Sequence, residues 1–145
     1  MRDLPRQLSV EQLAELFEGE TRLVQLLADT EDPLESADDV IATLSEQEKI
    51  EALRAHPAIG SRELSARSAS EQGPDADPAV LTELAYQNQV YEEKFGFRFV
   101  VFVAGRPKRE ILQVLAERIG NTRDEELETG LQELVAIARD RWTRT

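Results

Sequence analysis

The chain has a single histidine, His56, and this side chain is the best suited in the sequence to move a proton near neutral pH. An unperturbed imidazole has a pKa of about 6.5, so it can both take and return a proton. His56 stands directly before Pro57, where a helix is expected to end. Two interpretations follow: general acid–base catalysis, or a helix C-terminal cap that favours the helix dipole.

Other residue types narrow the chemistry further. The sequence has no cysteine, which excludes disulfides, thiolate nucleophiles, thiolate zinc sites and iron–sulfur clusters. With one histidine, a metal site would consist almost wholly of carboxylates, and no loop has the spacing that such a site needs. We therefore expect no metal.

Length and charge define the setting of this chemistry. At 145 residues and 41% hydrophobic content, the chain suits one domain over residues 1–145. A net charge of −12 opposes binding to nucleic acid or to an anionic membrane, although one buried arginine can still bind an anionic small molecule. No apolar run has the length of a membrane span or of a signal peptide, so we expect a cytoplasmic protein with no membrane partner.

Helices are the elements that must position these groups. Ser9 with Gln12, Ser45 with Glu48, and Thr122 with Glu125 have the capping-box spacing, and Ser36 with Asp39 is a similar start signal. Apolar spacing then predicts helices after Ser9, over residues 20–29, after Ser36, from Ser45 to near His56, from Asp77 to Gly96, from Pro107 to Gly120, and from Thr122 through Trp142. Residues 60–78 are mostly small and polar, which indicates a loop-rich stretch.

Residues 97–105 have the β-branched and aromatic character of a buried strand. No second strand is visible to pair with this segment, and a lone strand cannot satisfy its backbone hydrogen bonds. We therefore expect an extended segment inside a helical core. The predicted fold class is all-α, a single-domain bundle of about seven to eight helices with one extended buried segment.

Three blocks of sequence give the histidine a context. They read His56-Pro57-Ala58-Ile59-Gly60, then Ser68-x-x-Glu71-Gln72, then Asn88-x-x-Tyr91-x-x-Lys94-Phe95-Gly96-Phe97. In this order they resemble the family of 2-oxo-4-hydroxy-4-carboxy-5-ureidoimidazoline (OHCU) decarboxylases, whose pattern is His-Pro-x-Leu-Gly, Ser-x-x-Glu-Gln and Asn-x-x-Tyr-x-x-Lys-Phe-Gly-Phe. The resemblance continues through the final helices and spans essentially the whole chain.

The resemblance implies a carboxy-lyase of purine metabolism that converts OHCU, formed during urate degradation, into (S)-allantoin and CO₂. It implies an all-helical homodimer that needs no cofactor. Carried over block by block, it implies catalytic roles for His56 and Glu71, substrate contacts from Ser68 and Gln72, and a pocket shaped in part by Pro57. Glu71 also has the capping-box spacing to Ser68, and this structural role is compatible with catalysis.

The resemblance further implies a substrate-binding arginine on the last helix, at Arg141 or at its rival Arg139, and main-chain contacts to the substrate near Val101. Helix geometry favours Arg141. At about 100° per residue, Arg141 lies roughly 20° beyond Leu134 at one edge of the apolar stripe, whereas Arg139 lies roughly 40° beyond Val135 at the other. A cation in the last helical turn, complementing the helix dipole, is the structural alternative for Arg141.

The mechanism implied is acid–base chemistry on the substrate hydroxyl. His56 and Glu71 would work together as CO₂ leaves, and Arg141 would bind a substrate oxygen by charge-assisted hydrogen bonds. Because residues 73–77 depart from the small-residue segment of the family, a related acid–base enzyme on another ureido or imidazole compound is one alternative. An acidic helical module that binds a protein partner is the other, and it would not require His56, Glu71 and Arg141 to converge.

Overall fold

The computed structural model describes residues 4–59 and 77–144. Within these ranges the chain forms seven α-helices and no β-strand, which confirms the all-α prediction. The helices are α1 (Val10–Phe17), α2 (Arg22–Ala28), α3 (Ala37–Ala42), α4 (Glu46–Arg54), α6 (Pro78–Phe95), α7 (Lys108–Ile119) and α8 (Arg123–Arg144).

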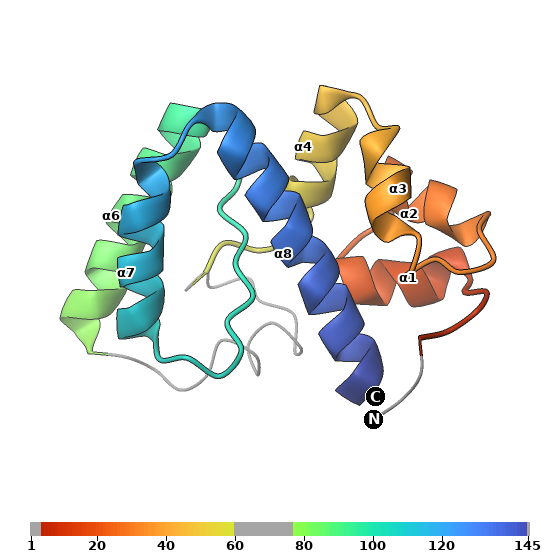
Figure 1. Cartoon of the computed structure of the whole chain (residues 1–145). Helices are drawn as coiled ribbons and strands as arrows, with labels where there is room; N and C mark the ends of the chain where they lie inside the picture. The colour runs from red at the N-terminus through yellow and green to blue at the C-terminus, as the bar shows by residue number, and fades with distance from the viewer. Residues whose placement is uncertain (1–3, 60–76, 145) are drawn as a thin grey trace.

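The helices form two groups joined by α8 (Figure 1). Helices α6 and α7 pack against each other, and α1 to α4 gather on the opposite side. The long helix α8 runs between the groups and contacts α1, α3 and α4. None of the helices in the described ranges is both long and apolar enough to cross a bilayer.

Three helices begin at the predicted capping boxes. In each, the side chain of the capping residue accepts a hydrogen bond from the backbone three residues on, and the side chain there accepts one from the capping residue's own N–H. The pairs are Ser9 with Gln12, Ser45 with Glu48, and Thr122 with Glu125. Local sequence alone therefore fixes the start of α1, α4 and α8.

The predicted start signal at Ser36 is only half right. Helix α3 does follow it, but the Ser36 side chain makes no capping hydrogen bond. A capping residue needs an extended backbone, whereas Ser36 has φ −88° and ψ 1° because its N–H already donates to the Asp32 carbonyl in a preceding turn. The preceding turn therefore replaces the side-chain cap.

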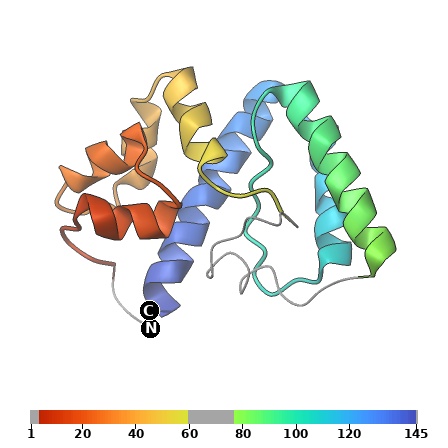
Figure 2. The same ribbon diagram turned by 180° about the vertical axis from the view of Figure 1, so that it is seen from behind.

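Helix α4 ends at Arg54, two residues before His56 and close to the end that Pro57 predicts. Ala55 is the C-terminal cap, and the His56 N–H donates to the Leu53 carbonyl at 3.3 Å. Pro57 has no N–H with which to continue the helix. The chain leaves α4 at this point and runs toward the extended segment (Figure 2).

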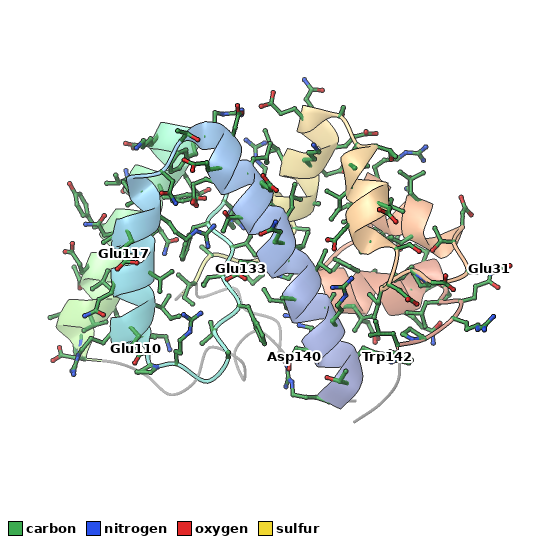
Figure 3. All side chains as sticks on the ribbon, viewed as in Figure 1. Glu31, Glu110, Glu117, Glu133, Asp140 and Trp142 are labelled. Carbon is green, nitrogen blue, oxygen red and sulfur yellow. The ribbon has the colours of Figure 1, made fainter. Side chains whose placement is uncertain are left out.

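The extended segment predicted over residues 97–105 is present as far as residue 103, where a turn at Ala104 and Gly105 follows, and it is largely buried. Charged side chains replace the missing neighbouring strand. Arg118 donates to the Val100 carbonyl at 2.8 Å, and Arg106 donates to the carbonyls of Phe102 and Val103. Glu133 of α8, labelled in Figure 3, accepts from the Phe102 N–H at 3.2 Å. These bonds satisfy backbone groups that a strand partner would otherwise bind.

A buried polar network holds α6, α7 and α8 together beside this segment. Glu126 is fully buried and accepts hydrogen bonds from Tyr91 at 2.7 Å, Arg118 at 2.7 Å and Asn121 at 2.8 Å. Burial, and then the hydrogen bond to Glu126, raise the pKa of the Tyr91 phenol far above its usual range. The phenol therefore stays protonated as a donor, and the Arg118 charge compensates the buried carboxylate.

Candidate active site

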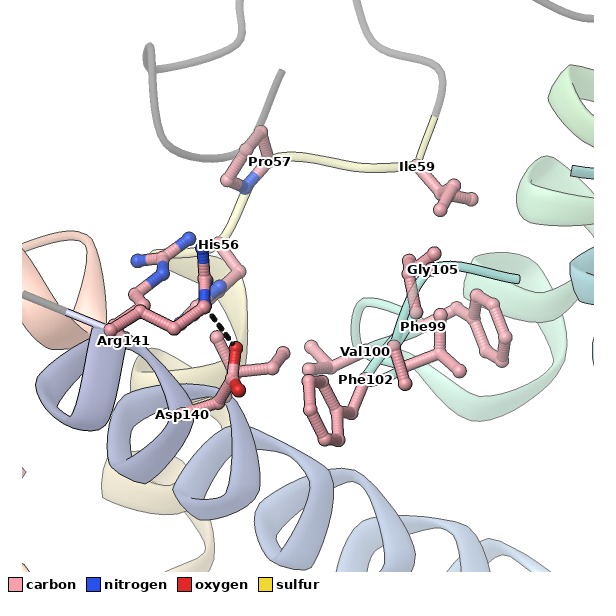
Figure 4. Close-up of a pocket in the computed structure, with 14 residues that line it drawn as sticks. His56, Pro57, Ile59, Phe99, Val100, Phe102, Gly105, Asp140 and Arg141 are labelled. Atoms are coloured by element: carbon pink, nitrogen blue, oxygen red, sulfur yellow. Dashed lines mark hydrogen bonds and ion pairs between the residues drawn. The ribbon is translucent and has the colours of Figure 1, made fainter. Parts of the chain in front are cut away.

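A pocket of about 480 Å³ opens where three parts of the chain meet. The end of α4 with the residues after it, the extended segment, and the last turns of α8 form its walls (Figure 4). Its lining residues are His56, Pro57, Ile59, Phe99, Val100, Val101, Phe102, Val103, Ala104, Gly105, Ile137, Asp140, Arg141 and Arg144. A pocket of this size, with apolar walls and a few polar groups, suits a small-molecule ligand.

His56 contributes an imidazole to the pocket from the end of α4. The residue is only 5% exposed, so contact with bulk water is restricted. Its own carbonyl accepts a hydrogen bond of 2.7 Å from Arg98 of the extended segment, which also donates to the Arg54 carbonyl at 3.3 Å. The main chain of His56 is therefore held by α4 through its N–H and by the extended segment through its carbonyl.

Arg141 reaches the same pocket from α8 and is 1% exposed. Its Nη1 donates to the carbonyls of Glu15 at 3.4 Å and Leu16 at 3.2 Å, in the last turn of α1. Its Nη2 forms an ion pair of 3.0 Å with Glu18. The guanidinium is thus anchored to the end of α1 as well as facing the pocket.

Arg139 points elsewhere, although it is only two residues from Arg141. It donates two hydrogen bonds to the Leu34 carbonyl, at 3.0 and 2.8 Å, and lies 3.9 Å from the Asp38 carboxylate. It is not among the residues that line the pocket. Of the two predicted arginines, the structure brings only Arg141 together with His56.

Two further predicted residues line the pocket, Pro57 and Val101. The side chains that bind the extended segment contact the main chain of Val100, Phe102 and Val103. Within the described part of the chain, the N–H and carbonyl of Val101 make no hydrogen bond. The other predicted site residues, Ser68, Glu71 and Gln72, lie outside the described residues.

Asp140 and Arg144 are pocket residues that the sequence analysis did not single out. They form an ion pair of 2.7 Å, drawn as a dashed line in Figure 4. Their spacing of four residues and opposite charges are a pattern that could have been recognised in the sequence. Flanking Arg141 on the helix, they add both signs of charge to this wall.

The arrangement can bind a small anionic or polar molecule and transfer a proton to or from it. One imidazole, two guanidinium groups and one carboxylate converge on walls formed mainly by Ile59, Ile137 and the extended segment. In the described residues no three His, Cys, Asp or Glu side chains gather in a way that could bind a metal ion. Proton transfer with electrostatic binding is therefore the chemistry that these pocket residues can support.

Comparison with known proteins supplies a family. The family model for OHCU decarboxylase matches residues 2–143. The 2-oxo-4-hydroxy-4-carboxy-5-ureidoimidazoline decarboxylase of Halalkalicoccus jeotgali is 35% identical over 105 residues, which are 69% of this chain and 60% of that protein. A uric acid degradation bifunctional protein from Bacillus sp. strain TB-90 is 32% identical over 105 residues, 69% of this chain and 21% of that protein.

A solved structure has the same fold over nearly its full length. It is a crystal structure of OHCU decarboxylase in the presence of (S)-allantoin, 26% identical, with a TM-score of 0.78 over 92% of this chain and 96% of that one. The curated relatives are matched less completely, since the chain spans between a fifth and three fifths of the two named above.

Proposed function

Because this chain belongs to the OHCU decarboxylase family, we propose that it removes CO₂ from OHCU to give (S)-allantoin in urate degradation. The observation that carries the proposal is the pocket shared by His56 and Arg141. These residues are far apart in the sequence, one just after α4 and the other on α8, and their side chains are of the types that transfer a proton and bind an anion. An interaction module has no need for such a convergence.

The reaction needs an electron sink, and the substrate contains one. One ring carbon bears a hydroxyl and a carboxylate, and the neighbouring carbon forms a C=N bond. As the bond to CO₂ breaks, its electron pair moves toward the C=N nitrogen and leaves an enol. The hydroxyl proton is then lost as the carbonyl forms, the neighbouring carbon gains a proton, and the nitrogen is protonated, so that one proton is consumed overall.

In the proposed mechanism His56 takes or returns the hydroxyl proton, and Glu71 works with it. Arg141 binds a carboxylate or carbonyl oxygen of the substrate through charge-assisted hydrogen bonds. Delivery of the proton to the neighbouring carbon from one face would set the handedness of the product. His56 and Arg141 already line one pocket, which supports their roles, whereas the role of Glu71 rests on the family resemblance.

The remaining contacts are proposed in the same way. Pro57 shapes the wall next to His56, and the main-chain N–H and carbonyl of Val101, which bind no other group in the described ranges, offer a donor and an acceptor to the ring substituents. Ser68 and Gln72 are proposed substrate contacts on the strength of their motif alone. The hydrophobic remainder of the pocket would exclude water from the reacting carbon.

The test is to generate OHCU in place from urate with urate oxidase and the hydrolase that follows it, and to monitor circular dichroism after adding this protein. We expect fast formation of optically active (S)-allantoin. We expect His56→Ala to lower kcat by roughly 10²-fold or more, the contribution typical of general acid–base catalysis, with an unchanged far-ultraviolet spectrum. His56→Asn, which keeps a polar group of similar reach, is the matched variant.

Other outcomes would redirect the proposal. A fully active His56→Ala enzyme would remove His56 from the mechanism. A signal no faster than spontaneous racemic decay would reject OHCU as the substrate and direct attention to another ureido or imidazole compound, or to a binding role. Incubating the protein with other ureido and imidazole compounds and analysing the products by mass spectrometry separates those two cases: a new product indicates another substrate, and none favours a binding role.

Assembly, location and domain extent are also proposed from the family resemblance. We propose a homodimer, a cytoplasmic location and a single domain over residues 1–145. Leu131 is buried in the core, so a dimer surface would not use it, whereas Trp142 packs against the core and stays partly exposed. Light scattering of the purified chain gives the assembly directly, and a monomeric mass at micromolar concentration would reject the dimer.

A further inference from the structure

Glu18 has an uncommon backbone conformation for a residue with a side chain. It ends α1 with φ 67° and ψ 23°, in the left-handed region where the Cβ atom crowds the backbone. Glycine avoids this crowding, and Gly19 stands one position later. A residue other than glycine costs energy in this backbone conformation, which suggests that the side chain of Glu18 has a functional or structural role.

The carboxylate of Glu18 has a defined partner in the pocket. It forms the 3.0 Å ion pair with Arg141, and its side chain is only 13% exposed, so water screens the pair weakly. The same guanidinium donates to the carbonyls of Glu15 and Leu16, one turn earlier. The end of α1 therefore binds Arg141 with two main-chain acceptors and one carboxylate.

Such a cradle fixes the position of a long side chain. An arginine side chain has many rotamers, and an arginine that must find its geometry anew in each binding event binds its ligand less tightly. The three acceptors approach the guanidinium from α1, which is not among the elements that line the pocket. Glu18 thus restrains Arg141 without itself lining the pocket.

We propose that Glu18 is a positioning residue for substrate binding, which acts by holding the Arg141 guanidinium in its binding geometry. The inference rests on the proposed function, because it takes Arg141 to bind the substrate. Its structural alternative is that Glu18 merely ends α1 and joins that helix to α8. The two roles differ in what happens to KM when the carboxylate is removed.

Two substitutions separate these roles. Glu18→Gly removes the carboxylate and also the conformational strain, so the backbone of α1 should be retained and Tm should not fall steeply. Glu18→Gln keeps the size of the side chain and one acceptor while removing the charge. For both variants we expect KM for OHCU to rise about tenfold, the loss that corresponds to one charge-assisted hydrogen bond. We expect kcat to change less than KM.

A matched control is available on α3, at a carboxylate paired with another arginine of α8. Asp38→Asn removes the carboxylate that faces Arg139, the arginine directed away from the pocket, in an exposed pair. We expect this variant to leave KM and kcat within about twofold of wild type, since exposed pairs contribute little. Because KM does not depend on the amount of active protein, partial unfolding of a variant cannot imitate the expected result.

The measured KM values decide between the positioning role and the structural role of Glu18. Raised KM in both Glu18 variants, with Asp38→Asn unchanged, supports the positioning role. If the wild-type protein is active on OHCU and the Glu18 variants have the same KM, the positioning role is overturned and the proposed function still stands. Absence of wild-type activity on OHCU rejects the proposed function, and the inference falls with it.

Discussion

Two arginines that are neighbours in sequence have different surroundings in this molecule. Arg141 is buried against the end of α1 and faces the pocket, while Arg139 binds the Leu34 carbonyl at a half-exposed position. Their positions at opposite edges of the apolar stripe of α8 produce this separation. The side chain that is anchored and buried is the one available for a precise role in the pocket.

Substitution by lysine tests the difference between them. Arg141→Lys keeps the charge but loses the planar fork that binds two oxygens at once, so we expect kcat/KM for OHCU to fall by roughly 10²-fold. Arg139→Lys should stay within about twofold of wild type, since exposed ion pairs contribute little. Steady-state kinetics on both variants, with circular dichroism to confirm folding, measures this. Equal losses in the two would assign no special role to Arg141.

At the residue scale the sequence predicted several residues that line the pocket, His56, Pro57, Val101 and Arg141, but it did not predict the partners that hold them. Helical periodicity placed Arg141 at the edge of the stripe because that geometry is local. Nothing local could reveal Glu15, Leu16 and Glu18 as its acceptors, since these belong to the first helix and meet α8 only through tertiary packing. The spacing of Asp140 and Arg144 could have predicted their ion pair, but only the structure shows that the pair lines the pocket.

Among the elements, the extended segment lines the pocket and also binds the end of α4, where His56 lies. Arg98 at its beginning binds the carbonyls of Arg54 and His56, at the end of α4. The position of the imidazole therefore depends on a contact between two elements that are separate in the sequence. Loss of this contact should affect the pocket more than the fold.

We expect Arg98→Ala to lower kcat about tenfold, because a charge-assisted hydrogen bond to the His56 main chain is lost and the imidazole can move. The far-ultraviolet spectrum should be unchanged. Arg54→Ala is the control: Arg54 also joins α4 to the chain beyond α6, through the Gly96 carbonyl at 3.2 Å, but its side chain does not bind the His56 carbonyl. A wild-type kcat in Arg98→Ala would show that α4 alone positions the histidine.

Elements were predictable where their signals were local. Capping boxes gave the starts of α1, α4 and α8, and Pro57 and Gly96 gave the ends of α4 and α6. Ser36 was misjudged because a cap depends on the backbone angles of the preceding turn, which the residue type does not determine. The extended segment was expected from its lack of a partner strand, but the charged side chains that bind it come from distant positions.

On the scale of the whole molecule, the buried Tyr91 couples stability to pH. In the unfolded chain a tyrosine loses its proton near pH 10.0, whereas in the folded chain the raised pKa of Tyr91 keeps the phenol protonated. The unfolded state then binds fewer protons than the folded state, so the free energy of unfolding decreases as the pH rises above about 10. Below that pH the contribution of Tyr91 is fully present.

A comparison of Tyr91→Phe with Tyr86→Phe isolates the contribution of the Tyr91 pKa to the pH dependence of stability. Urea unfolding from pH 8 to 11 should show a smaller decrease of the unfolding free energy for Tyr91→Phe than for wild type. At neutral pH the same variant should be less stable by about 1 kcal/mol, because it loses the hydrogen bond to Glu126. Tyr86→Phe, at the other tyrosine and 59% exposed, should retain the wild-type slope. Parallel slopes for wild type and Tyr91→Phe would contradict the coupling.

The way the extended segment is held also governs what happens when the protein unfolds. Its aromatic and β-branched residues, with Arg98 as the only charge between Phe97 and Val103, form a window suited to cross-β stacking between copies. In the native state individual side chains bind several of its main-chain groups, and most of its side chains are buried, so in the described structure little of the segment is available to a second molecule. Heating removes that protection at once, and the net charge of −12 is then the main force against association. Thermal unfolding should therefore become less reversible as the protein concentration and the salt concentration increase.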